Sequence, residues 1–258
     1  MIVDAHAHIY PALPGGFWSR PSSTEALISA MDDAGVQRAG VLAIAPHISA
    51  EVVCAAASVQ PDRLFAVGSV DPRDPAAVPE LNRQVGELGV RAIKLHPGLQ
   101  RWGFEDLDRL VPLATRCGEL GVPLVVCSFL GGRDLFRGRT IEACHELAAA
   151  APNTPIVLAH AGGYRPLDAL LVLKANPNVH VDLSFSPLYF AGSSVVQDLE
   201  YLVKKADPRR VLFGSDFPEV SMAASVAWIL DVADRLGLTD AHREAILCGN
   251  AARLFRLA

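Results

Sequence analysis

The sequence alternates short apolar runs with segments of helical periodicity along its whole length. Eight runs rich in valine, isoleucine and leucine predict strands, at residues 2–8, 39–45, 64–70, 90–96, 123–128, 156–160, 179–184 and 211–216. These runs are largely apolar throughout, as strands of a parallel sheet covered on both faces require. After the first run, apolar positions at helical spacing extend to Ala34, with Ser22, Ser23 and Thr24 as the expected cap and Gly35 as the expected end.

Eight strand–helix units in 258 residues predict a single (β/α)8 TIM barrel that occupies residues 1–258 as one domain. A doubly wound sheet is the alternative, and it usually carries a glycine-rich phosphate turn after its first strand. Here the first strand runs directly into His6 and His8, and neither GxGxxG nor GxxxxGK[ST] follows it. The barrel is therefore preferred.

Composition narrows the class of protein further. The chain is 51% hydrophobic and 20% charged, so it can bury a large core and is not disordered. The net charge of -5 and the lack of long basic runs argue against a nucleic-acid partner. The start of the chain does not resemble a signal peptide, and no stretch predicts a membrane span. We expect a cytoplasmic protein with a small-molecule substrate, without a membrane or nucleic-acid partner; its oligomeric state stays open.

Histidines and acidic residues follow several of the predicted strands. His6 and His8 are two apart on one strand, so both side chains point to the same face. One could simply cap the strand while the other packs in the core, but the pair favours a metal site. His160 and Asp216 end two other strands. Because the carboxyl ends of barrel strands share one rim, these four residues predict a site for a catalytic divalent metal with an open water position.

Five motifs together resemble the amidohydrolase superfamily over nearly the whole chain. Its amidohydrolase-2 branch, which contains metal-dependent hydrolases and decarboxylases similar to aminocarboxymuconate-semialdehyde decarboxylase, is the most similar. The motifs are DAHAH at 4–8, IKLHP at 93–97, LAHAGG at 158–163, LFGSDFP at 212–218 and GNAARLF at 249–255.

The resemblance implies a role for each matching residue. His6 and His8 correspond to metal ligands on the first strand, and Asp216 to the ligand and proton carrier of the eighth. His160 corresponds to a sixth-strand histidine that acts on the metal-bound water or on the substrate. The catalytic residues expected are therefore Asp216 and His160, and the cofactor is one divalent metal ion, with zinc as the expected metal.

Cys127 marks the main departure from the family. The fifth strand of the branch normally supplies a metal-binding histidine in a pattern similar to PVxIHxG, whereas this chain reads PLVVCSF. A thiolate is a good zinc ligand, and the metal itself lowers the pKa of a coordinating thiol. We therefore include Cys127 among the expected ligands. The alternative is that Cys127 is a small buried residue and that the ligand has been lost.

Substrate contacts are expected from residues near the rim. Lys94 is expected to form an ion pair inside the barrel or to meet a substrate carboxylate. Other superfamily branches carbamylate a lysine at the end of strand four to bridge two metals, but IKLHP resembles the mononuclear branch and predicts one metal. The substrate-binding residues expected are His96, Lys94, Trp18 and Tyr164, and His47 is a further candidate.

Three functions are consistent with these residues. The first is a metal-dependent hydrolase that activates water to attack an ester, lactone or amide carbonyl. The second is a non-oxidative decarboxylase of an aromatic or unsaturated carboxylic acid. The third, favoured only by Cys127, is a metal-free, inactive or ligand-binding barrel.

Overall fold

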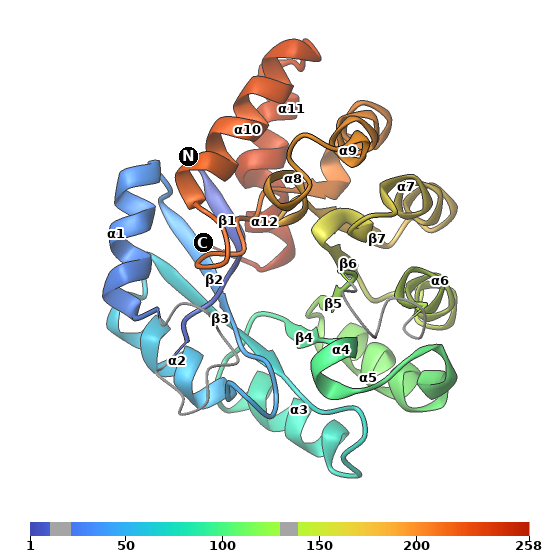
Figure 1. The fold of residues 1–258 in the computed structure, drawn as a ribbon. Coiled ribbons are helices and arrows are strands. Elements are labelled where there is room, and N and C mark those ends of the chain that lie inside the picture. The colour runs from blue at the N-terminus through green and yellow to red at the C-terminus, as the bar shows by residue number, and fades with distance from the viewer. Residues whose placement is uncertain (11–21, 130–138, 258) are drawn as a thin grey trace.

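Eight parallel strands form one sheet in the computed structural model, which describes residues 1–10, 22–129 and 139–257. Each strand pairs with the next in sequence order, and helices surround the strands (Figure 1). All eight predicted strands are confirmed, and the fold is the predicted (β/α)8 TIM barrel. The strands are β1 Val3–Ala7, β2 Arg38–Leu42, β3 Leu64–Ser69, β4 Ile93–Leu95, β5 Leu124–Cys127, β6 Ile156–Ala159, β7 Val179–Asp182 and β8 Val211–Leu212.

Helices connect the strands and cover the outside of the barrel. The predicted first helix is confirmed: Ser23 caps its start and Gly35, with φ of 66°, ends it. None of the helices in the described residues is long and apolar enough to cross a membrane. The α-helices are α1 Thr24–Ala34, α2 Ala50–Val59, α3 Ala77–Gly86, α4 Pro97–Gln100, α5 Leu107–Leu120, α6 Thr140–Ala150, α7 Pro166–Ala175, α8 Ser186–Tyr189, α9 Ser194–Lys205, α10 Met222–Arg235, α11 Asp240–Glu244 and α12 Asn250–Leu254. Short turns of other helical types span η1 Phe104–Asp106, η3 His160–Gly162, η4 Pro208–Arg210 and η5 Ala245–Gly249.

The buried apolar side chains form two groups. The larger group lies between the strands and the outer helices, and it includes Leu124 and Val126 of β5. The smaller group fills the barrel interior, where Val125 of the same strand packs among residues of the other strands. Phe255 closes the amino-terminal end of this interior, with its ring 5.0 Å from that of Phe65. Alternation along β5 therefore directs Val125 and Cys127 inward.

The first strand contains an irregularity that matters for the site. Asp4 pairs with Ala39 but Ala7 pairs with Val41, so β1 carries one extra residue there. This is a β-bulge, which lets two successive residues face the same side. Ala5 fills the barrel interior, whereas Ala7 packs with the outer group. The bulge therefore permits the next histidines to face inward after Ala5.

Buried polar contacts join β1 to the segment after β8. Asp4 accepts hydrogen bonds from the backbone N–H groups of His6 and Ser215, both at 2.9 Å, and from the Ser215 hydroxyl. Burial raises the pKa of Asp4 to about 7, against the lowering effect of these bonds. Gly214 lies so close that an added Cβ would be 3.0 Å from the Cβ of His6. The strand end that carries the histidines is thus held tightly against the last strand.

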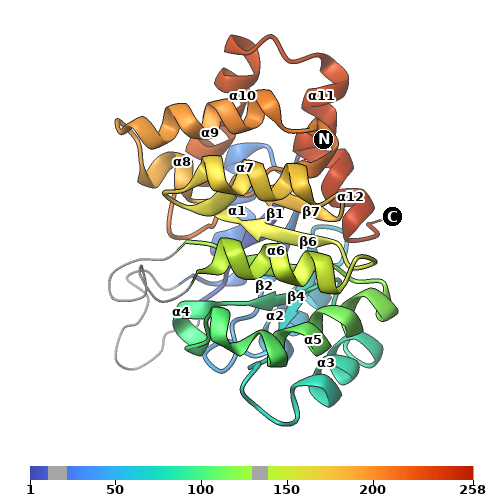
Figure 2. The ribbon, with the colours of Figure 1, turned by 90° about the vertical axis from the view of Figure 1, so that its right-hand side faces the viewer.

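The carboxyl ends of the strands define one face of the barrel. Figure 2 shows the barrel from the side, with α4 and α8 at one end and α12 with the C-terminus at the other. α4 directly follows β4, and α8 follows β7. The face with α4 and α8 is therefore the carboxyl-terminal face, where TIM-barrel enzymes place their active sites.

His180 of β7 is expected to make the protein less stable in mild acid. Burial, together with the charges of Arg253 and Arg210, lowers its pKa to about 4. The unfolded chain binds the proton more tightly, so stability present above pH about 6.5 is lost as the pH falls toward 4. We expect this residue to cost about 3 kcal/mol of unfolding free energy across that window. Urea unfolding of the protein and of His180→Gln from pH 8 to 4 measures this loss of unfolding free energy. An equal pH dependence of stability in both proteins would contradict the role of His180.

Candidate metal and catalytic site

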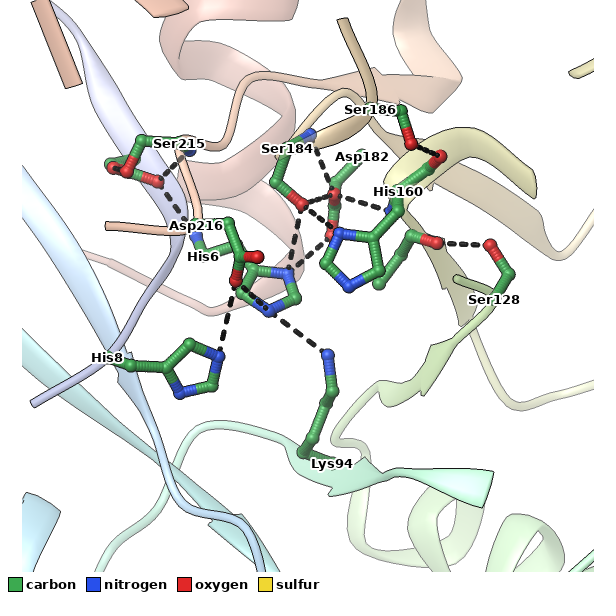
Figure 3. A network of polar contacts seen from close by, with 12 residues as sticks. His6, His8, Lys94, Ser128, His160, Asp182, Ser184, Ser186, Ser215 and Asp216 are labelled. Carbon is green, nitrogen blue, oxygen red and sulfur yellow. Dashed lines mark hydrogen bonds and ion pairs between the residues drawn. The ribbon is translucent and has the colours of Figure 1, made fainter. Parts of the chain in front are cut away.

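Three side chains converge at the carboxyl-terminal face of the barrel. Asp216 Oδ1 lies 3.5 Å from His6 Nε2 and 3.4 Å from His8 Nε2. The ligand atoms of this trio lie within 4.8 Å of one another, and all three residues are buried. Figure 3 shows them side by side, with Asp216 above His8. The structure thus brings together three of the four residues that the sequence predicted as metal ligands.

Hydrogen bonds fix how the two imidazoles face this point. His6 Nδ1 donates to Asp182 Oδ2 at 2.9 Å, and His8 Nδ1 donates to the backbone carbonyl of Leu42 at 3.0 Å, because each of those oxygens can only accept. The Nε2 atom of each ring then offers its lone pair toward Asp216. Burial, followed by the charge of Lys94, lowers the pKa of His6 to about 4, so this ring is neutral at pH 7.

This donor set fits a divalent metal. Two nitrogen lone pairs and a carboxylate oxygen approach one another, an arrangement that a cation between them would stabilise. Ligands about 2.1 Å from a tetrahedral zinc lie about 3.4 Å apart, which matches the two distances from Asp216. Metal-binding histidines also commonly donate their second nitrogen to a carboxylate or a backbone carbonyl, as His6 and His8 do here.

Asp182 and Ser184 belong to the site although the sequence analysis did not single them out. Besides His6, Asp182 accepts hydrogen bonds at Oδ1 from the backbone N–H groups of His160 and Ser184, both at 3.0 Å. Burial raises the pKa of Asp182, but the neighbouring His6, then His160 and Lys94, outweigh this effect and hold the pKa below its usual range. Asp182 ends β7 and Ser184 follows it, with the two-residue spacing of His6 and His8, a signal that is present in the sequence.

Asp182 is expected to strengthen metal binding through His6. Asp182→Asn keeps the size of the side chain but removes the carboxylate that orients the ring. We expect the metal affinity to fall by about 10- to 100-fold, the usual effect of losing such a partner. Competition against a chromogenic chelator measures the affinity, and Asp207→Asn, at the opposite end of the barrel, is the matched control. Unchanged affinity in Asp182→Asn would show that the ring does not need this partner.

Lys94 is almost fully buried and reaches into the same cluster (Figure 3). Its Nζ lies 3.1 Å from His6 Nε2, so the amine contacts the very nitrogen that faces Asp216. Within the described residues, no carboxylate forms a salt bridge with it. The contact found is therefore a hydrogen bond to His6 and not the ion pair that was one of the two expectations. Substrate-carboxylate binding by Lys94 stays a prediction.

His160 lies beside His6, with ring centroids 4.8 Å apart. Its Nδ1 is 2.9 Å from the Ser184 hydroxyl. Burial lowers the pKa of His160, but Cys127 and Asp216 outweigh this effect and raise it above its ordinary value. Both His160, with φ of 64°, and Asp216, with φ of 68°, adopt the left-handed backbone region. Such strain in non-glycine residues often marks functional sites.

Cys127 is buried at the end of β5 but is not part of the His6–His8–Asp216 group. Its neighbours are His96 and His160, whose charges and hydrogen bonds outweigh burial and hold the pKa of the thiol well below its ordinary value. His96 also caps α4, where its Nδ1 accepts from Leu99 N at 3.3 Å. The structure therefore places Cys127 beside the site's histidines, and its role as a metal ligand stays a prediction.

Alkylation tests the role of Cys127. If its sulfur completes the metal site, bound metal covers it, so we expect iodoacetamide to modify it faster after chelation. Mass spectrometry after timed labelling measures the rate. Cys144 serves as an internal control that reacts slowly, because burial raises the pKa of its thiol. Equal rates with and without metal, together with full metal affinity in Cys127→Ser, would make Cys127 a packing residue only.

The other predicted substrate contacts are less closely tied to the site. Tyr164 is 41% exposed, and no ring contact or hydrogen bond joins its side chain to the cluster within the described residues. His47 lies in an exposed turn after β2. Trp18 lies outside the described residues. The substrate-binding roles of His96, Tyr164 and Trp18 stay predictions.

An aromatic cluster borders the site on the side of His160. The ring of Phe129 lies 6.3 Å and that of Phe185 6.1 Å from the His160 ring, both edge-on. Phe185 also stacks with Tyr189, at 4.9 Å between centroids. These rings offer an apolar surface next to the polar cluster, which suits a substrate with a flat apolar part.

Comparison with known proteins identifies the class. The family model described as Amidohydrolase matches residues 3–257, and the chain belongs to this family, in its amidohydrolase-2 branch. The predicted resemblance is thereby confirmed. No protein of curated function matches the sequence.

Solved structures with similar folds share low sequence identity with this chain. A TIM-barrel protein from Bordetella bronchiseptica is 22% identical with a TM-score of 0.78, covering 99% of this chain and 98% of its own. A 2,6-dihydroxybenzoate decarboxylase from Rhizobium is 20% identical with a TM-score of 0.73 and the same coverage of 99% and 98%. An amidohydrolase from Burkholderia multivorans with bound zinc is 20% identical with a TM-score of 0.72, covering 100% of both chains. At these identities the similarity shows the fold.

Proposed function

We propose that this chain is a metal-dependent hydrolase that acts on an ester, lactone or amide carbonyl of a small molecule. The observation that carries the proposal is the convergence of His6 Nε2, His8 Nε2 and Asp216 Oδ1 with both Nδ1 atoms already engaged. His6, His8 and Asp216 would hold the metal, and zinc suits this nitrogen and oxygen set. The zinc-bound amidohydrolase of the same fold supports that choice.

A bound divalent metal would lower the pKa of water and polarise the carbonyl to be attacked. Among the residues of the protein, Asp216 would carry the proton. Burial raises the pKa of this carboxyl, but the neighbouring His8, His160 and His6 outweigh this effect and hold the pKa well below its usual range, so Asp216 is ionised. Its carboxylate is thus ready to accept a proton at an oxygen and to pass it to the leaving group.

His160 would act on the substrate from the opposite side. Its raised pKa favours the protonated form of the ring, and its Nδ1 lies 2.9 Å from the Ser184 hydroxyl. A protonated imidazole in this place can donate a hydrogen bond to an oxygen on which negative charge develops. Lys94 supplies a second buried donor beside His6, suited to a carboxylate carried by the substrate.

A non-oxidative decarboxylase of an aromatic or unsaturated acid is the second candidate. The aromatic cluster of Phe129, Phe185 and Tyr189 beside His160 favours it, because it offers a flat apolar wall next to a proton donor. In this reaction His160 would supply the proton to the carbon that loses the carboxylate, and Lys94 would bind the carboxylate before it leaves. The decarboxylase of the same fold supports this alternative.

Elemental analysis followed by a substrate screen tests the proposal. We expect about one equivalent of divalent metal per chain, and activity on an ester, lactone or amide that a chelator removes and added metal restores. Carbon dioxide release from aromatic acids, with no hydrolysis, would replace the hydrolase by the decarboxylase. Failure to bind metal would overturn both and favour a ligand-binding barrel.

A further inference from the structure

A hollow lies at the end of the barrel opposite the proposed metal site. It has a volume of about 640 Å3, and His180, Asp207 and Arg210 are among its lining residues. His180 is the second residue of β7, and η4, which holds Arg210, ends just before β8. The hollow is therefore at the amino-terminal end of these strands, on the side of α12 in Figure 2.

Positive charge dominates this hollow. Four cationic side chains line it, and Asp207 is the one carboxylate among its lining residues. The cationic residues are Lys174, Arg209, Arg210 and Arg253. The whole chain, in contrast, has a net charge of -5. An excess of three positive charges in one small concavity of an acidic protein creates a local attraction for anions.

Two of the guanidinium groups are held in place by the backbone. Arg210 Nη1 donates to the carbonyls of Leu173 at 2.6 Å and Asn176 at 2.9 Å. Arg253 Nη2 donates to the carbonyl of Arg209 at 2.8 Å. These bonds use one terminal nitrogen of each group, and guanidinium has five N–H donors. The remaining donors are therefore pre-positioned, which lowers the entropic cost of binding an oxyanion.

His180 gives independent support at the wall of the hollow. Its side chain is buried, with a relative exposure of 9%, and its Nδ1 has no hydrogen-bond partner within the described residues. Buried polar atoms without a partner are rare in proteins. The charges of Arg253 and Arg210 also favour the neutral form of the His180 ring. The electrostatic potential at this wall is therefore positive, and a bound anion would lower it.

We propose that this hollow binds a phosphate group, either free or carried by a small organic molecule. Several arginines around one concavity suit a doubly charged tetrahedral oxyanion, since their forked donors can bond its oxygens in pairs. The volume is within the range of small-molecule sites and leaves room for an organic body beside the phosphate. One concavity lined by seven residues, in a chain of net charge -5, favours a small ligand over a nucleic acid, which needs an extended basic surface.

Calorimetric titration with inorganic phosphate and with glycerol 3-phosphate, at constant ionic strength, tests the proposal on the intact metal-loaded protein. We expect saturable binding of one equivalent, weakened by about tenfold or more in Arg209→Gln/Arg253→Gln because two charge-assisted partners are lost. Arg235→Gln, which removes an exposed arginine on α10, is the matched control and should bind as the unmodified protein does. Tighter binding of the ester than of phosphate would identify a phosphorylated metabolite as the ligand, and equal binding would identify free phosphate.

Two further measurements keep the result interpretable. Asp216→Asn should retain phosphate binding, because the proposed metal site is at the other face; loss of binding there would assign the phosphate to the metal and overturn the proposal. Thermal unfolding without phosphate checks that the double variant is folded, and added phosphate should raise the Tm of the unmodified protein more than that of the variant. No saturable binding, or equal binding by the double variant, would also overturn the proposal.

Discussion

Replacing His6 and His8 together with alanine is expected to abolish stoichiometric metal binding while the barrel stays folded. These residues supply two of the three converging ligand atoms, and a single carboxylate cannot hold the metal alone. Folding should survive because the stability of a TIM barrel resides mainly in its packed interior and lower face. Elemental analysis gives the metal content, and circular dichroism with thermal unfolding gives the folded state.

His242→Ala is the matched control, since this histidine is exposed on α11. It should bind metal as the unmodified protein does. Full metal occupancy in the double variant would show that His6 and His8 are not the ligands. It would also refute the proposed hydrolytic mechanism, which depends on a metal held by these residues.

Changing Asp216 to asparagine is expected to lower kcat by about 100-fold or more, the usual contribution of a general acid–base group. The amide preserves the shape of the side chain but cannot accept the proton. Because Asp216 is also a proposed ligand, metal content must be measured on the same sample, and kcat compared at equal occupancy. Asp231→Asn, a change to an exposed residue of α10, controls for nonspecific effects. An asparagine variant with normal kcat would refute the role of Asp216 in proton transfer.

The fold followed from the sequence because its signals are local and repeated. Each apolar run became a strand, and Ser23 and Gly35 bound the first helix as their capping preferences predict. The bulge in β1 could not be predicted, because it depends on contacts between Asp4 and Ser215, which are distant in the sequence. Spacing alone put His6 and His8 on one face, but only the three-dimensional structure shows why that face is the inner one.

The sequence predicted the site residues that lie at the ends of strands, but it did not predict the contacts that Cys127 and Lys94 make. His6, His8, His160 and Asp216 lie together because parallel strands share one carboxyl-terminal face. Asp182 carries the same signal, a polar residue at the end of a strand, but was not among the predicted residues. The partners of Cys127 depend on side-chain directions in neighbouring strands, and the contact of Lys94 with His6 depends on the reach of a flexible chain. Neither can be read from residue spacing.

The extra residue in β1 divides that strand into two parts with different tasks. Before it, Val3 and Ala5 fill the barrel interior. After it, His6 and His8 face Asp216 at the carboxyl-terminal end of the barrel. A deletion or insertion of a single residue between Asp4 and His6 would turn both imidazoles toward the outer surface, while Val3 and the other interior side chains stayed in place. Length variation at this point is therefore a route by which such a chain could keep its architecture and lose its chemistry in one mutational step.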